Sequence, residues 1–115
     1  MNELIESSLR LLTIVRVLHW KTRSYAEHIA LGDFYDNFSD TLDKLVEVWQ
    51  GSIKARASDI SIDSIEISDS TDINKELKIV DGILTDIEDL TTDVMNIRDE
   101  LLGHINKLRY LLTLK

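Results

Sequence analysis

The sequence predicts an all-α fold, an antiparallel four-helix bundle, and three observations support this prediction. The chain has no proline and only four glycines among its 115 residues, so few positions interrupt a helix. Its apolar residues recur every three or four positions along most of the chain, as they do on the buried side of a helix. The length fits one compact domain and is too short for two, so we expect a single domain over residues 1–115.

The first helix is predicted from residue 2 to residue 21. Its apolar side is formed by Leu4, Ile5, Leu9, Leu12, Val15 and then Leu18 or His19. The polar run Thr22-Arg23-Ser24 predicts a short joint after it. Ser24 followed by Glu27 has the spacing of a capping box, so a second helix should begin there.

The second helix is predicted from residue 24 to residue 57. Its apolar side is formed by Phe34, Phe38, Leu42, Leu45, Trp49 and Ile53. Gly32 and Gly51 each weaken it by about 1 kcal/mol relative to alanine without ending it. Four aromatic residues, Phe34, Tyr35, Phe38 and Trp49, are more than one small core readily hides, so the pattern also predicts self-association.

Residues 58 to 70 follow a different pattern, in which isoleucines nearly alternate with serine, aspartate and glutamate. The isoleucines are Ile60, Ile62, Ile65 and Ile67. Thirteen extended residues can reach about 43 Å, which is close to the length of a 30-residue helix, about 45 Å. The segment is therefore predicted to run the length of the bundle as a long extended crossover between the second and third helices, with its isoleucines on the bundle. The alternative is a flexible loop in which the alternation of isoleucines with polar residues is accidental.

Two more helices are predicted, from residue 72 to 90 and from residue 94 to 113. Ser70 or Thr71 can cap the first of them, and Asp93 can cap the second after the β-branched pair Thr91-Thr92. The apolar repeat nearly continues across this break, so a single helix over 72–113, forming a coiled coil, is the alternative.

Composition excludes several classes of function. The formal net charge is −8, which argues against nucleic acid as a partner because a phosphate backbone requires basic residues. The N-terminal residues do not form a signal peptide, and the apolar runs are too short to span a membrane. The chain has no cysteine, so disulfides and thiolate metal sites are excluded, and a cytoplasmic location fits.

The second helix contains residues that could bind a metal ion, namely His28, Asp36, Asp43 and Glu47. At about 100° of rotation per residue, the three acids lie about 60° to 100° from His28 on one side of the helix, at the border of the apolar stripe. Metal ligands at the border of the apolar stripe suit a metal site between two subunits. The alternative is a solvated face, since the chain has 21 acidic residues. For His19 the alternative interpretation is a histidine at the edge of the core that is hydrogen-bonded to a backbone carbonyl, and His104, alone in the last helix, is assigned to this interpretation.

Three parts of the chain together form a wider pattern. They are Leu18-His19-Trp20-Lys21, then His28, then Asp43-Lys44-Leu45-Val46-Glu47, which begins fifteen residues after His28. This order resembles the ferroxidase segment of the Dps proteins, the miniature ferritins that oxidise and store iron. The C-terminal run from Ile105 to Leu112 is similar to the end of that family's last helix, while residues 54–90 contain no motif of the family.

The resemblance implies a ferritin-like fold, iron as the metal and a homo-oligomer. It implies that His19 and His28 bind iron from one subunit, that Asp43 and Glu47 bind it from the partner, and that Trp20 is an electron donor beside the site. The chain also departs from the family. The joint after Trp20 is about three residues shorter, Gly32 stands where the family often has an acid, and the N-terminus has no lysine-rich tail.

Two functions from different classes follow from the sequence. One is a Dps-like iron-binding protein or ferroxidase. The other is a non-catalytic ferritin-like bundle that acts as a structural or protein-interaction module, a kind of protein that a phage genome could encode.

Overall fold

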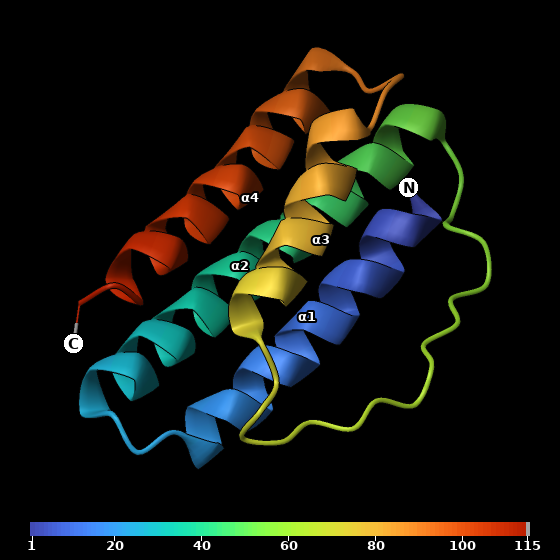
Figure 1. Ribbon diagram of the computed structural model, residues 1–115. Coiled ribbons are helices and arrows are strands. Elements are labelled where there is room, and N and C mark those ends of the chain that lie inside the picture. Colours follow the sequence, from blue (N-terminus) through green and yellow to red (C-terminus); the bar gives the residue numbers. More distant parts are fainter. Residues whose placement is uncertain (115) are drawn as a thin grey trace.

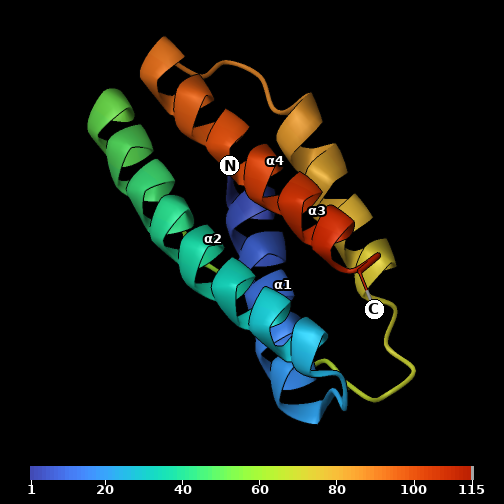
Figure 2. The same ribbon diagram turned by 90° about the vertical axis from the view of Figure 1, so that its left-hand side faces the viewer.

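The structure, a computed structural model, describes residues 1–114, and over this range the chain forms four α-helices and no β-strand. The helices are α1 (Asn2–Lys21), α2 (Tyr25–Ile53), α3 (Ile73–Asp86) and α4 (Thr92–Leu111). They lie side by side with roughly aligned axes (Figure 1). α1 and α4 each pack against α2 and α3, so α1 and α4 are diagonal to each other, as are α2 and α3 (Figure 2). The predicted all-helical bundle is therefore confirmed.

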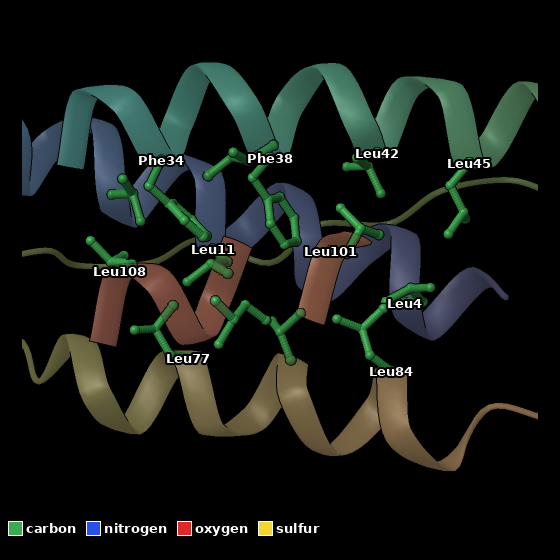
Figure 3. Close-up of a cluster of buried hydrophobic side chains, with 14 of the residues drawn as sticks. Leu4, Leu11, Phe34, Phe38, Leu42, Leu45, Leu77, Leu84, Leu101 and Leu108 are labelled. Carbon is green, nitrogen blue, oxygen red and sulfur yellow. The ribbon is translucent and has the colours of Figure 1, made fainter. Parts of the chain in front are cut away.

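The core lies between the four helices and consists mainly of leucine, isoleucine and valine around two phenylalanines of α2. Figure 3 shows Phe34, Phe38, Leu42 and Leu45 of α2 pointing toward leucines of the other three helices. These four side chains are buried, as their spacing predicts. The fully buried members of the other helices include Leu4, Leu11, Val15, Leu77, Leu84, Val94, Leu101 and Ile105.

The four aromatic side chains of α2 that suggested self-association are largely covered within one copy of the chain. Phe34 and Phe38 are buried, and Tyr35 and Trp49 are half-buried against the core. Four converging helices cover more aromatic surface than one helical face suggests, so these side chains give less reason to expect self-association, which stays a prediction. Within residues 1–114, no helix combines the length and the apolar content needed to cross a membrane.

The start of α2 is close to the prediction, and its end is earlier. The Ser24 hydroxyl accepts a hydrogen bond from the Glu27 backbone N–H at 3.2 Å, which is half of a capping box. The Glu27 carboxylate accepts instead from the Thr22 hydroxyl at 2.8 Å. α2 ends at Ile53 and not at residue 57, because Lys54 adopts a left-handed conformation with φ 55° that stops the helix.

The start of α3 is capped by a different residue from those predicted. Asp72 is the N-cap, and its carboxylate accepts from the backbone N–H groups of Asn74 and Lys75. Thr71, one of the predicted caps, instead accepts from the Ser68 backbone N–H at 3.0 Å and closes the turn before the helix. An aspartate caps at least as well as serine or threonine, which explains the shift.

The break between α3 and α4 is real, so one helix over 72–113 is excluded. α3 ends at Asp86, four residues before the predicted end, because Ile87 is extended and Asp89 has φ 60°. The N-cap of α4 is Thr91, and the helix ends at Leu111. Asp93, the predicted cap, lies in the first turn of α4, where a hydrogen bond from the Thr91 hydroxyl lowers the pKa of its carboxyl group.

The segment between α2 and α3, residues 54–72, is tied to both ends of α1. At one end the Asn2 side-chain amide donates to the Ser58 hydroxyl at 2.6 Å and to the Asp59 carbonyl at 3.2 Å. At the other end, the Lys21 ammonium lies 3.6 Å from the Asp69 carboxylate. The segment follows the outer side of α1 between these two ties (Figure 1).

None of the four isoleucines of this segment joins the core, and the prediction that they lie on the bundle is wrong for Ile60 and Ile62. Ile60 is 39% exposed and Ile62 is 51% exposed, while Ile65 and Ile67 are half-buried. The eleven steps from Ser58 to Asp69 cover the length of α1, about 28 Å at 1.5 Å per residue. Each step therefore advances about 2.6 Å, less than the roughly 3.3 Å of a fully extended chain, so the backbone bends and the side chains do not alternate cleanly onto one surface.

Candidate metal centre

His19 and His28 lie against each other at the joint between α1 and α2. His19 is in the last turn of α1, His28 is in the first turn of α2, and only residues 22–24 separate the two helices. Their imidazole rings are stacked, with centroids 3.8 Å apart and planes 14° from parallel. The two histidines that the sequence singled out therefore meet within one chain.

Each histidine is held by the backbone of the other. His19 Nδ1 lies 2.6 Å from the carbonyl oxygen of His28, and His28 Nδ1 lies 2.8 Å from the carbonyl oxygen of His19. Because a carbonyl oxygen only accepts, both Nδ1 atoms donate. In the neutral rings, each Nε2 then has a lone pair. Metal-binding histidines are typically oriented in the same way, by donating their other ring nitrogen to a carbonyl or carboxylate.

Gly32 provides the space in which the His19 ring lies. A Cβ atom at position 32 would be 2.8 Å from His19 Cε1, closer than such atoms approach, and 3.2 Å from His19 Nδ1, which is a tight contact. At this position the Dps pattern often has an acid, and here the His19 ring fills that space. The prediction treated Gly32 as a weak point of the helix and as a departure from the Dps pattern, and not as space for a ring. A glycine in the middle of a helix was itself the available signal, because it often marks a close contact.

The aromatic residues around the pair are exposed. Trp20 follows His19, and its side chain is 68% exposed. Tyr25 is 79% exposed, and its ring centroid lies 6.5 Å from that of His28. Ile29, one helical turn after Tyr25, is exposed as well. The end of α2 that contains His28 thus presents aromatic and apolar surface to solvent.

The acidic candidates lie far from the histidines of the same chain. Asp43 and Glu47 are exposed, and Asp43 is fifteen residues after His28, about 22 Å along the helix axis. Asp36 is exposed, and its carboxylate is 3.7 Å from the Arg16 guanidinium, which lies over the Tyr35 ring. Within residues 1–114, no three histidine, aspartate or glutamate side chains are grouped closely enough to hold a metal ion. A site with three such ligands would need at least one ligand from outside these residues.

The stacked rings limit what the histidines can bind. An imidazole binds a metal ion in the plane of its ring, and two stacked, nearly parallel rings cannot share one ion about 2.1 Å from both Nε2 atoms. Each ring can hold one ion of its own. The donor set fits a pair of ions, whereas a single ion would require one ring to turn.

His104 has a different role. Its Nε2 atom lies 3.0 Å from the hydroxyl of Thr41, a buried residue of α2. The contact joins α4 to α2. His104 is therefore a histidine at the edge of the core, as the alternative interpretation held.

Comparison with known proteins gives a family and no function. Residues 19–112 match a family of unknown function, DUF5856. The chain belongs to this family. We found no match among curated proteins or among solved structures.

The DUF5856 match begins at His19, so it includes both histidines of the stacked pair, Trp20, and the three acids Asp36, Asp43 and Glu47. It also includes the segment between α2 and α3. Most of α1, up to Leu18, lies outside the matched residues. All the candidate metal ligands therefore belong to the part of the chain that defines its membership in DUF5856.

Proposed function

We propose that this chain is a ferritin-like bundle of antiparallel helices that binds iron in the cytoplasm, at sites completed by a second copy of the chain. The fold proposal is supported by the short joint between α1 and α2 and by the contacts of residues 58 and 69 with opposite ends of α1. If residues 54–72 are a crossover along α1, every pair of packed helices is antiparallel, as in a ferritin-type bundle.

The observation that supports iron binding best is the reciprocal hydrogen bonding of His19 and His28. It fixes both rings so that Nδ1 donates and Nε2 can bind a metal. Because the two rings are stacked and nearly parallel, each would bind an ion of its own. Imidazole nitrogen with carboxylate oxygen is a donor set that suits Fe(II).

The outer face of α2 offers a way to bring the carboxylates to the histidines. His28 lies near one end of α2, and the exposed pair Asp43 and Glu47 lies near the other. If two copies pack their α2 helices antiparallel around a two-fold axis near Asp36, the acids of each copy lie opposite the histidines of its partner. The exposed Tyr25 and Ile29 then supply apolar contact. Such packing brings Asp33, Asp36 and Asp40 of both copies together, so bound cations would stabilise it.

The chemistry is oxidation of bound Fe(II). Two Fe(II) ions each lose one electron, and one hydrogen peroxide molecule accepts both electrons with two protons to give two water molecules. The product Fe(III) is harder and favours the carboxylate oxygens of Asp43 and Glu47. Trp20, next to His19 in the chain, is a candidate for a side chain that supplies an electron.

The second candidate function is a non-catalytic interaction module. It is favoured by the exposed acids and by the fact that both histidines bond to backbone, because these bonds also fasten α1 to α2 without any metal. In this case the stacked pair is a structural clamp, and function lies in the surfaces that other molecules contact.

An anaerobic Fe(II) titration by calorimetry, with the mass in solution measured on the same sample, separates the two candidates. The test variant is Asp43→Asn/Glu47→Gln, which changes exposed side chains on α2. The matched control is Asp86→Asn/Glu100→Gln, which makes the same charge change at exposed residues of α3 and α4. Saturable binding to an oligomer that the first variant loses and the second retains would support the iron site. If a folded wild-type protein gives no heat above the buffer blank, the iron site is refuted and the interaction module is the remaining candidate.

A further inference from the structure

The segment Asp59–Ile67 has the features of an unpaired β-strand. Between Ile60 and Ile67, no backbone N–H or C=O group has a hydrogen-bond partner within residues 1–114. Ile60 and Ile62 are exposed, and the neighbouring acids Asp59, Asp63 and Glu66 are in solvent. Exposed strands of this kind pair with other strands through their backbone groups.

The segment is also held in place before any pairing. Asn2 fixes Ser58 and Asp59, and the Lys21–Asp69 ion pair fixes the other end. The segment therefore has fewer conformations to lose than a free loop on forming a strand, which favours association.

We propose that two copies of the chain pair through this segment as an antiparallel two-stranded ribbon. In this ribbon Ile60 lies opposite Ile67 of the partner copy, Ile62 lies opposite Ile65, and Asp63 lies opposite Ser64. The remaining pairs set Asp59 against Ser68 and Ser61 against Glu66. Every isoleucine then faces an isoleucine, and every acid faces a serine.

Other registers are worse for identifiable reasons. A shift by one residue in either direction sets each isoleucine opposite a serine or an acid, and one of these shifts sets Asp63 opposite Asp63. A shift by two residues sets Asp59 or Asp63 opposite Glu66. Like charges directly opposite each other destabilise a strand pair, whereas paired β-branched side chains stabilise it. The sequence therefore selects one register.

The same register covers the isoleucines that one chain leaves exposed. Side chains alternate between the two faces of a paired strand, so on forming the ribbon Ile60 and Ile62 would point to one face, and Ile65 and Ile67 to the other. In the ribbon, Ile60 and Ile62 of one copy share a face with Ile65 and Ile67 of the partner. Because Ile65 and Ile67 are half-buried in their own chain, the exposed pair is brought to the surface of the partner.

This interface is independent of the proposed iron site, which uses the outer face of α2. The charge pattern also argues for a second copy as the occupant. The five acids from Asp59 to Asp72 would repel an acidic partner, yet the antiparallel register lets two copies of the segment meet without opposing any two of them.

The test uses two single-cysteine variants, Ser61→Cys and Glu66→Cys, in a chain that has no other cysteine. Mild oxidation in the presence of a metal chelator should give a disulfide-linked dimer when the two variants are mixed, because positions 61 and 66 face each other. Each variant alone should give at least several-fold less dimer, because its two cysteines lie about five residues apart, roughly 17 Å, along the ribbon. A mixture of Ser61→Cys with Ser70→Cys is the matched control.

Equal cross-linking in all four samples, or none in the mixture of Ser61→Cys with Glu66→Cys, would overturn the proposal. Sedimentation in chelator provides a second measurement. Ile62→Lys should reduce the average mass of the protein, whereas Ile79→Lys, which changes a comparably exposed isoleucine on α3, should not. If Ile62→Lys sediments as wild type, the segment does not pair with a second copy. If the wild-type protein is a monomer at all concentrations tested, two copies do not pair through this segment in any register. Neither result depends on iron.

Discussion

Replacing Gly32 with alanine tests whether the His19–His28 pair is a defined structural unit. The new Cβ atom would lie 2.8 Å from His19 Cε1, so the ring must move away from His28 and from its carbonyl oxygen. The loss of one hydrogen bond costs about 1 kcal/mol, and the loss of the stacked contact costs about another 1 kcal/mol. The higher helix propensity of alanine, relative to glycine, stabilises the helix by about 1 kcal/mol. The net effect expected is a destabilisation of about 1 kcal/mol.

Two other glycines provide matched controls for this substitution. Gly82 in α3 and Gly103 in α4 are exposed, have ordinary helical backbone angles, and would present a Cβ atom to open space. Alanine at either position should stabilise the protein by about 1 kcal/mol, since only the helix propensity changes. Gly32→Ala should therefore differ from both controls by about 2 kcal/mol, and each 1 kcal/mol corresponds to a change in Tm of about 4 °C in a protein of this size.

The assay is urea denaturation at pH 7 together with the ¹⁵N spectrum of the histidine rings, which distinguishes the Nδ1-protonated form. In the wild type, both His19 and His28 should carry the proton on Nδ1. In Gly32→Ala, His19 should lose this preference. If Gly32→Ala stabilises the protein as much as Gly82→Ala does and leaves the His19 signals unchanged, the stacked pair does not exist as described.

Three further predictions concern the core and one ion pair. The Ser8 hydroxyl is buried without a hydrogen-bond partner among residues 1–114. Ser8→Ala should therefore raise the free energy of unfolding by about 1 kcal/mol; a lower free energy of unfolding, measured by urea denaturation, would show that the hydroxyl makes a hydrogen bond. Phe38 is fully buried, so Phe38→Ala should cost about 3–5 kcal/mol, and a loss below 1 kcal/mol would contradict the packing shown in Figure 3. The Arg109 hydrogen bond lowers the pKa of Asp81 from 3.8, so this bond stabilises the fold above about pH 4 and is lost as the pH falls through the lowered pKa. Asp81→Asn should therefore cost about 0.5–1 kcal/mol at pH 7 and leave stability unchanged near pH 2; an equal loss at both pH values would refute the ionic origin.

The helices and the core could be predicted from the sequence because apolar spacing reports a helix face directly. Phe34, Phe38, Leu42 and Leu45 are buried as their spacing predicts. The ends of the helices were less predictable, because they depend on competition between neighbouring residues. The predicted end of α2 was wrong by four residues because spacing does not reveal the left-handed conformation of Lys54.

The candidate site could be predicted only in part. Sequence resemblance selected His19 and His28, and the short joint between α1 and α2 brings them together. Their stacking depends on Gly32, and the absence of a side chain is a weak signal in one sequence. The roles of Asp43 and Glu47 remain a prediction, because the histidines they would approach belong to another copy of the chain.

The two proposed interfaces have separable consequences for assembly. One uses the outer face of α2, and the other uses the segment that follows the outer side of α1. Two two-fold interfaces on one chain build an assembly larger than a dimer. With Fe(II) present, Ile62→Lys should then leave dimers joined through α2, and Asp43→Asn/Glu47→Gln should leave dimers joined through the segment. The two variants combined should give monomers. If either variant alone gives monomers in the presence of Fe(II), the interface left intact in that variant does not hold two copies together by itself.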